Sequence, residues 1–600
     1  MAENTNPVEF YQSRIKELEI ELAALNAKKN RLAWLRFGAI AAAFLFAYFL
    51  WSSGPAVAVV AFILFFALFL RIVVIDLKNK NKIENTNTLI RLNEEEIKIA
   101  DHRFTHLFSG EMYLPTAHDY AGDLDIFGRA SVFQYLNRTN SEQGNELFAN
   151  WLLQPADKST VFLRQSAAKE LASNTAWRQQ LQATGISEKI KKDTQQKIKA
   201  WATEENSFLN KGSWPVLRFV LPVIILSILA LHIIGIIPGP IFYGIAFLFF
   251  LASGAISKKI MPIYDKLNKI APQIETLSGS AAWIESGKFT TPALLNIQNQ
   301  FGNNNRKASA DIRHLKHILD RFDLRLNPLV FIPLNTLLFW DLQQAFALEK
   351  WKTLHKENAT QWFSALAEME CLSSLGTISF NHPSWVYPVI AEEHGILKGE
   401  EIGHPLIPAF KRVNNSFATT GKGQLALITG SNMAGKSTFL RSIGVNIVLA
   451  MMGAPVCARS FNLSPMKVMS SMRIADNLEE STSTFYAELK KLKSIIEAVN
   501  RKEKIFILLD EILRGTNSLD RHTGSKALIK QLIHHEATGM IATHDLELAK
   551  LTEEFPINIH NYHFDVQVAN EELYFDYKLK TGICESLNAS ILMKKIGIEM

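Results

Sequence analysis

One octapeptide decides the fold of this chain, and it reads Gly430-Ser431-Asn432-Met433-Ala434-Gly435-Lys436-Ser437. It satisfies the pattern GxxxxGK[ST], in which the backbone N–H groups of a glycine-rich loop surround anionic phosphates. The short apolar run 425–429 precedes the octapeptide, and an apolar helix is expected over 438–449. A glycine-rich loop between a buried strand and a helix predicts an α/β nucleotide-binding domain of the P-loop type, with the phosphates at the helix N-terminus.

The residue types in this loop suit ATP and Mg²⁺, which we expect as cofactors. The ammonium group of Lys436 is expected to reach the terminal phosphates, and the hydroxyl of Ser437 is expected to ligate Mg²⁺. The other expected nucleotide-binding positions are Gly430, Ser431, Asn432, Met433, Ala434, Gly435 and Thr438.

Two further apolar runs end in chemically active side chains. The run 505–509 is followed by Asp510 and Glu511, which fits the second nucleotide-binding motif of such domains. Asp510 would complete the magnesium shell, and Glu511 would orient or deprotonate the water that attacks the γ-phosphate. The run 539–543 ends at His544, for which we expect contact with the γ-phosphate, although a histidine at such a position is often only structural. The acidic pair favours hydrolysis over passive nucleotide binding.

Four apolar stretches are long enough to cross a bilayer, which takes about 20 residues. They lie at 32–51, 54–75, 219–237 and 241–256, and only the first two contain a charge, Arg36 and Arg71. Short uncharged turns near Ser53 and Gly239 join them in pairs, and Lys and Arg residues flank both pairs. Positive flanks are typical of cytoplasmic ends. We therefore expect two transmembrane hairpins, 32–75 and 216–257, in a multi-pass protein of the inner or cytoplasmic membrane whose soluble domains are cytoplasmic.

The segment 1–31 is predicted to be an amphipathic helix. Its apolar residues recur at spacings of three and four, as in a coiled coil, and are Val8, Tyr11, Ile15, Leu18, Leu22 and Leu25. Pairing with a second copy and packing on the chain's own polar segment after Ile75 explain this pattern equally well.

The composition excludes several classes of protein. Among the 600 residues 48% are hydrophobic and 20% are charged, which is incompatible with a disordered or collagen-like chain. The three cysteines, Cys371, Cys457 and Cys584, are far apart and have no zinc-ligand spacing, which argues against a disulfide framework or a zinc site. The net charge of +6 is compatible with nucleic acid or with anionic lipid.

The chain resembles the MutS family of mismatch-repair ATPases. The matching segments are the loop with its Asn432-Met433 pair, Ser483-Thr484-Phe485 with Glu488, Asp510-Glu511-Ile512, Arg514-Gly515-Thr516, Ala542-Thr543-His544 and Gly403-His404-Pro405. The resemblance implies a homodimer with two composite ATP sites, to each of which Ser483 is contributed by the opposite chain. Alternatively, Ser483 or Thr484 only caps the helix that follows.

The resemblance extends to the helical part of the chain. The segments 136–165 and 320–375 look like the family's helical core and lever helices. The implied domains are a helical core in two parts, 76–215 and 258–395, and an ATPase domain, 396–600. Two departures stand out, because Ala434 and Leu513 occupy positions where the family usually has glycine. In addition, no segment before the helical core matches the family's mismatch-reading domain.

DNA is the expected partner, together with the lipid bilayer and a second copy of the chain. The candidate DNA contacts form a basic cluster, which consists of Arg306, Lys307, Arg313, Lys316, Arg321 and Arg325, with His314 and His317 between them. Basic side chains neutralise phosphates, but a solvated helix face explains the same cluster equally well. Two other functions stay open at this point, an ABC-type transporter and an ATP-driven membrane scaffold that acts without DNA.

Overall fold

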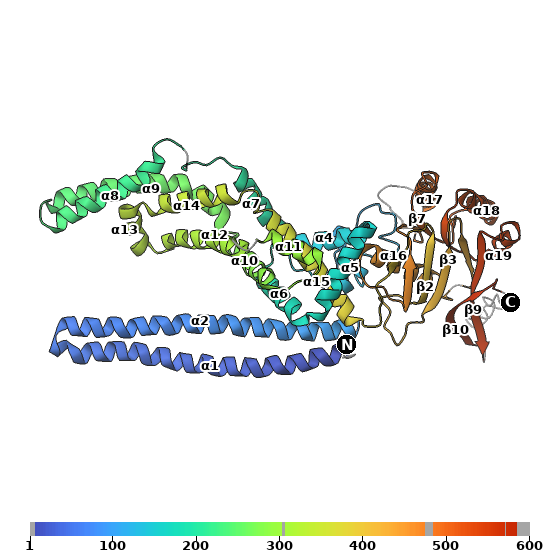
Figure 1. Ribbon diagram of the computed structural model, residues 1–600, viewed down its shortest axis with the longest axis horizontal. Coiled ribbons are helices and arrows are strands. Elements are labelled where there is room, and N and C mark those ends of the chain that lie inside the picture. The colour runs from blue at the N-terminus through green and yellow to red at the C-terminus, as the bar shows by residue number, and fades with distance from the viewer. Residues whose placement is uncertain are drawn as a thin grey trace.

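The computed structural model describes residues 6–209, 211–302, 306–431, 433–473, 484–569 and 572–584. The molecule is elongated, with the β-sheets at one end, a helical body in the middle and two helical hairpins that project to the other end (Figure 1). Within the described part of the chain, four helices are long and apolar enough to cross a membrane, namely α1 with its 3-10 turn (Pro7–Ser53), α2 (Pro55–Ala100), α8 (Trp214–Ile233) and α9 (Gly239–Asn268).

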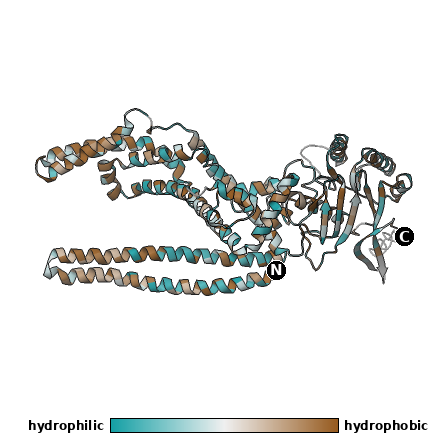
Figure 2. Cartoon of the chain, viewed as in Figure 1, coloured by the Kyte–Doolittle hydropathy of each residue, from teal (hydrophilic) through white to brown (hydrophobic). Residues whose placement is uncertain are grey.

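The first hairpin consists of α1 (Pro7–Leu50), η1 (Trp51–Ser53) and α2. At the start of α1 the Asn6 side chain accepts a hydrogen bond from the backbone N–H of Val8, and Pro7 occupies the first turn. At 1.5 Å per residue each of these two helices is roughly 65 Å long, about twice the thickness of a bilayer core. Apolar residues gather toward the turn, whereas the half nearer the helical body is more polar (Figure 2).

In the polar half, α1 packs against α2. Leu18 is buried against Leu89 and Leu92 of α2 and against Ala183 of α6 (Thr175–Ser187). The side chain of Asn79 donates to the carbonyl of Leu25 at 3.0 Å. Of the two explanations for the apolar seam, packing on the chain's own polar segment is therefore the arrangement observed.

An ion pair joins the two helices near the border between the polar and apolar halves. Nη1 of Arg36 lies 2.9 Å from Oδ2 of Asp76. The only charge in the apolar stretch 32–51 is thus compensated by a partner on the neighbouring helix.

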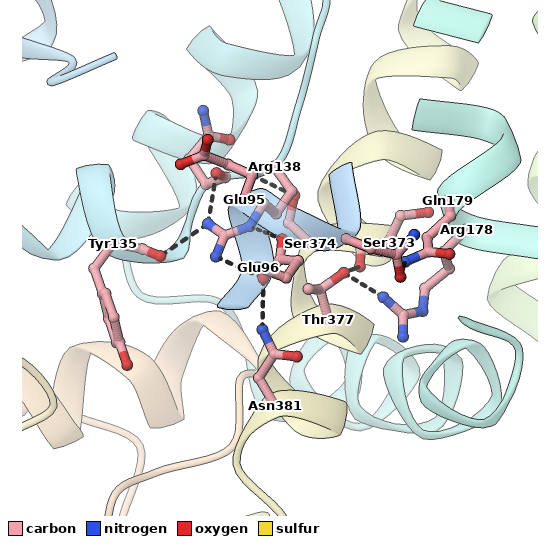
Figure 3. Close-up of polar contacts among 12 residues, drawn as sticks. Glu95, Glu96, Tyr135, Arg138, Arg178, Gln179, Ser373, Ser374, Thr377 and Asn381 are labelled. Carbon is pink, nitrogen blue, oxygen red and sulfur yellow. Dashed lines mark hydrogen bonds and ion pairs between the residues drawn. The ribbon is translucent and has the colours of Figure 1, made fainter. Parts of the chain in front are cut away.

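A buried polar network attaches α2 to the helical body (Figure 3). Glu96, near the end of α2, accepts hydrogen bonds from Nε of Arg138 at 2.5 Å and from Nδ2 of Asn381 at 2.7 Å. Arg138 follows α3 (Val132–Leu136), and Asn381 is the last residue of α15 (Gln361–Asn381). Because both charges are buried and fully hydrogen-bonded, removing either one would leave an uncompensated charge.

The helical body lies between the hairpins and the sheets. Its other elements are η2 (Glu111–Tyr113), α4 (Glu142–Leu153), α5 (Lys158–Ser173), α7 (Lys192–Thr203), α10 (Ala271–Ser286), α11 (Pro292–Gln300), α12 (Ala308–Phe322), η3 (Asp323–Leu326), α13 (Pro328–Leu338) and α14 (Trp340–His355).

Two sheets form the C-terminal end of the molecule. A four-stranded sheet has the order β1-β5-β2-β3, with β1 (Val389–Ile390), β2 (Ile396–Ile402), β3 (Asn415–Thr420) and β5 (Ser460–Leu463). A six-stranded sheet has the order β10-β9-β4-β8-β7-β6, with β4 (Leu425–Thr429), β6 (Lys467–Ser471), β7 (Ile505–Asp510), β8 (Thr538–Ala542), β9 (Ile559–Ala569) and β10 (Glu572–Thr581). All its neighbouring strands are parallel except β10, which pairs antiparallel with β9 at the edge. The helices of this domain are α16 (Lys436–Met452), α17 (Thr484–Asn500), α18 (Ser518–His534), α19 (Leu546–Ala549) and α20 (Leu551–Glu554).

Candidate nucleotide site

The three predicted apolar runs are neighbouring parallel strands of the six-stranded sheet. β8 lies between β4 and β7, and every residue of the three strands is buried. Because parallel strands end at the same edge, the loop after β4, Glu511 after β7 and His544 after β8 meet there. The structure thus brings together the side chains that the sequence placed at the ends of separate strands.

The loop after β4 has a backbone that requires glycine at two positions. Gly430 and Gly435 have φ values of 143° and 106°. A Cβ atom on Gly430 would lie 2.8 Å from the carbonyl oxygen of Phe564, and one on Gly435 would lie 3.1 Å from the ring of Tyr577. Ala434 is buried, and its φ is not positive, so alanine fits where the MutS pattern has glycine. Asn432, an expected nucleotide-binding residue, lies outside the described residues.

Lys436 begins α16 and folds back over the loop. Its Nζ atom donates to the carbonyl oxygens of Gly430 and Ser431, both at 2.8 Å, and lies 3.5 Å from Nε2 of His544. Burial lowers the pKa of Lys436, whereas the carboxylates of Glu511 and Asp510 act in the opposite direction. The loop, the lysine and the histidine therefore share one site.

Each carboxylate oxygen of Glu511 contacts a nitrogen of a neighbouring side chain. Its Oε1 atom lies 2.5 Å from Nε2 of His544, and its Oε2 atom lies 3.0 Å from Nε of Arg514. The hydrogen bond from His544 is the largest cause of the lowered pKa of Glu511, so this carboxyl is ionised at neutral pH. In the sequence Arg514 is visible only as part of the motif Arg514-Gly515-Thr516, and its contact with Glu511 depends on the turn after β7.

Asp510 offers a metal ligand. It is buried at the end of β7, and in the described part of the chain its Oδ1 atom has no hydrogen-bond partner. A buried carboxylate oxygen without a donor suits a hard cation such as Mg²⁺, with the Ser437 hydroxyl as a second protein ligand. Among the residues described, no three His, Cys, Asp or Glu side chains cluster to hold a metal.

A cavity of about 470 Å³ adjoins the loop. Its lining includes Ser431, Met433, residues 435–439, Ser442 and Glu511, together with His404, Lys411, Arg412, Asn415, Phe564 and Tyr577. Its size is within the range of small-molecule sites. None of the last six residues is among the site residues expected from the sequence, because the segment before β3 and the hairpin β9–β10 reach the cavity only through tertiary packing. The available signals were the matching segment Gly403-His404-Pro405 and the adjacent pair Lys411-Arg412.

The segment before α17 contained the predicted trans-acting residue. Ser483 lies outside the described residues, so its position relative to the cavity stays a prediction. Glu488 of α17 accepts a hydrogen bond from the backbone N–H of Leu513 at 2.5 Å. Leu513 has a φ of 60°, a conformation that glycine adopts more easily, and it stands where the MutS pattern has glycine. The start of α17 is therefore tied to the turn that carries Glu511.

The basic cluster proposed for DNA is partly engaged inside the molecule. Lys316 pairs with Asp320, and Nη2 of Arg325 lies 2.8 Å from Oδ2 of Asp341. The Arg325 side chain is only 9% exposed. The cluster belongs to the α12 region, remote from the sheets (Figure 1). Arg325 therefore has a structural partner, while Arg313 is exposed.

Comparison with known proteins identifies the domain that contains this site. The family model described as MutS domain V matches residues 426–595, a range that includes Lys436, Glu511 and His544. Over its C-terminal part, this chain is thus similar to the MutS family. The predicted resemblance is thereby confirmed, and MutS domain V is a domain of the ATPase type.

Three relatives show the extent of the similarity. DNA mismatch repair protein MutS from Thermotoga sp. (strain RQ2) is 30% identical over 249 residues, which are 41% of this chain and 30% of the relative. The protein of the same name from Protochlamydia amoebophila is 32% identical over 237 residues, 38% of this chain and 27% of the relative. MutS protein homolog 4 from Homo sapiens is 34% identical over 236 residues, 37% of this chain and 24% of the relative. The chain thus spans less than a third of the length of these relatives.

Proposed function

We propose that this chain is a membrane-anchored MutS-type ATPase, which binds and hydrolyses ATP with Mg²⁺ in a homodimer and acts on DNA. The observation that carries the proposal is the convergence of Lys436, Glu511 and His544 at one sheet edge beside the cavity. These groups are of the types needed for phosphate binding and for activation of water.

Each side chain has a defined part in the proposed reaction. The backbone N–H groups of the loop and the ammonium of Lys436 bind the phosphates, and Ser437 and Asp510 hold Mg²⁺, which neutralises phosphate charge. Glu511 accepts a hydrogen bond from the attacking water and directs it at the γ-phosphate. His544 and Arg514 fix the direction of that carboxylate. Lys411 and Arg412 add positive charge to the lining of the cavity.

In the proposed homodimer, each nucleotide site receives a hydrogen-bond donor from the second chain. We propose that Ser483 of the opposite copy completes each site, as the MutS resemblance implies. Within one chain, the bond from Leu513 to Glu488 links the helix that follows Ser483 to the turn that carries Glu511. The contribution in trans rests on the MutS resemblance.

Membrane anchoring rests on the exposed apolar surface of the two hairpins. Trp34, Phe37, Phe44, Leu64, Val223, Phe247 and Leu248 are each more than half exposed. The two hairpins point in the same direction, away from the sheets, and their outer ends are the most apolar parts of the molecule (Figure 2). One bilayer can therefore take up both hairpins while the nucleotide site stays in water.

The transporter alternative is not favoured. The comparisons match MutS proteins, and His232, a polar residue of the second hairpin, is engaged locally. Its Nδ1 atom lies 2.9 Å from the carbonyl oxygen of Ile237, beside the turn. It is thus satisfied by the hairpin itself and does not mark a transport pathway.

The proposal is tested by the ATPase rate of the purified full chain in the presence and absence of DNA. We expect hydrolysis, stimulated by duplex, branched or mismatched DNA, with Glu511→Gln as the inactive control. Hydrolysis that no DNA alters would favour the ATP-driven scaffold. Absence of hydrolysis in well-folded protein would contradict the ATPase assignment.

A further inference from the structure

Helix α13 is a short apolar helix that the sequence analysis did not single out. No charged residue occurs between Arg325 and Asp341, and the intervening 326–340 includes the whole of α13. Leu326 is 76% exposed, Leu329 is 88% exposed and Ile332 is 46% exposed. With eleven residues, α13 is roughly 16 Å long and cannot cross a bilayer core of about 30 Å.

The polar side of α13 faces the protein. Asn335 is buried, its Nδ2 atom donates to Oγ of Ser257 in α9 at 3.0 Å, and its Oδ1 atom accepts from the N–H of Asp341 at 3.1 Å. α13 also packs against α8. The exposed apolar side chains of α13 therefore point away from the α8–α9 hairpin, against which this helix packs.

The contacts place α13 beside the apolar part of α9. The ring of Phe339, directly after α13, lies 5.9 Å from that of Phe249, and Phe249 is within the predicted span 241–256. Figure 1 shows α13 next to the α8–α9 hairpin, at the end of the helical body that faces away from the sheets. A lipid layer around Phe249 would reach α13 as well.

The residues that flank the apolar segment 326–340 lie close together. Nη2 of Arg325 lies 2.8 Å from Oδ2 of Asp341, and the Arg325 guanidinium lies 4.4 Å from the centre of the Tyr264 ring in α9. Tyr264 comes after Lys258 and Lys259, the basic residues that end the span. The segment 326–340 therefore leaves and re-enters the protein on the same side of the proposed membrane.

We propose that α13 is a re-entrant membrane element, embedded in the cytoplasmic leaflet beside the α8–α9 hairpin, and that lipid acyl chains cover its exposed face. The helical conformation pairs backbone polar groups within the segment, as hydrocarbon requires, except that Pro333 has no N–H to donate to the carbonyl of Leu329. The Arg325–Asp341 ion pair joins the two ends of this element at the interface between lipid and water. This inference rests on the membrane anchoring proposed above.

The test places an environment-sensitive fluorophore on single introduced cysteines in the full chain, reconstituted in phosphatidylcholine and phosphatidylglycerol vesicles. The positions are Leu329→Cys in α13, Leu248→Cys in α9 and Arg313→Cys on the exposed side of α12. The native cysteines Cys371, Cys457 and Cys584 are buried, and the unsubstituted chain measures any background labelling. Quenching is compared between nitroxide-bearing lipids and iodide in the water phase.

We expect lipid-borne nitroxide to quench the labels at 329 and 248, and iodide to quench the label at 313. A label at 329 that responds to iodide, while 248 responds to lipid, overturns the inference and leaves the anchoring intact. A label at 329 shielded from both quenchers shows that protein covers α13, such as a second copy, and also overturns it. Failure of the lipid quencher at 248 rejects the anchoring itself, and the inference falls with it.

Discussion

The Nε2 atom of His544 lies 2.5 Å from the Oε1 atom of Glu511, so the second residue after β8 orients the first residue after β7. The backbone of Glu511 is also unusual, with a φ of 52°, and its N–H donates to the carbonyl of Ala542 at 2.9 Å. A carboxylate fixed in this way has a single direction toward the cavity.

The first prediction separates nucleotide binding from hydrolysis. Glu511→Gln should retain ATP and slow turnover by about 10²-fold or more, because it removes the proposed base. Lys436→Ala should lose tight binding, because the phosphates lose their ammonium partner. Equilibrium binding of labelled ATP and steady-state hydrolysis measure the two effects, and parental turnover in Glu511→Gln would disprove the role of this carboxylate.

The second prediction concerns the pH profile of hydrolysis. The hydrogen bond from His544 is the main cause of the lowered pKa of Glu511, so His544→Ala should raise that pKa toward its ordinary value. A base is active when deprotonated, and the acidic limb of the kcat profile should therefore move to higher pH. A lower rate with an unshifted acidic limb would show that His544 does not act through Glu511.

The third prediction tests the shared site. Ser483→Ala and Lys436→Ala homodimers should both be inactive. A mixed dimer should regain up to about half the activity per dimer. Both substitutions then fall in one composite site, and the other site is intact. The measurement is the ATPase rate of co-purified, differently tagged chains in detergent. A fully active Ser483→Ala homodimer, or an active monomer, would contradict this arrangement.

The fourth prediction concerns topology. Cysteines introduced at Ser53 and Gly239, in the turns of the two hairpins, should react with a membrane-impermeant reagent from outside intact cells. Cysteines at Lys78 and Lys258 should not, because basic flanks stay in the cytoplasm. The reverse labelling pattern would invert the proposed orientation.

The fifth prediction is a pH dependence of stability that originates in the helical body. Burial raises the pKa of Glu370 to about 7, although hydrogen bonds from Ser141 act in the opposite direction. A raised pKa means that the protonated carboxyl favours the folded state. Its contribution is complete below the ordinary carboxyl pKa and is lost as the pH rises through 7, on the order of 3 kcal/mol in total.

Glu370→Gln should remove this dependence. The Tm of the parental chain in detergent should fall between pH 5.5 and 8.5 by more than that of the variant. Equal slopes in the two proteins would show that Glu370 is not the titrating group.

Local patterns in the sequence determined the elements of this protein. The apolar runs before Gly430, Asp510 and His544 correspond to β4, β7 and β8, and the four long apolar stretches lie within α1, α2, α8 and α9. A strand, a helix and a membrane-length segment each leave a period or a length in neighbouring residues, so a single pass along the chain finds them.

Only the tertiary structure decided which of these elements meet. It placed the seam of α1 on α2, brought Phe564 and Tyr577 against the loop after β4, and paired Arg325 with Asp341 beneath α13. Each of these contacts joins residues whose separation along the chain carries no periodic signal. They depend on how the packed helices and strands direct side chains toward one another, which the order of residues does not display.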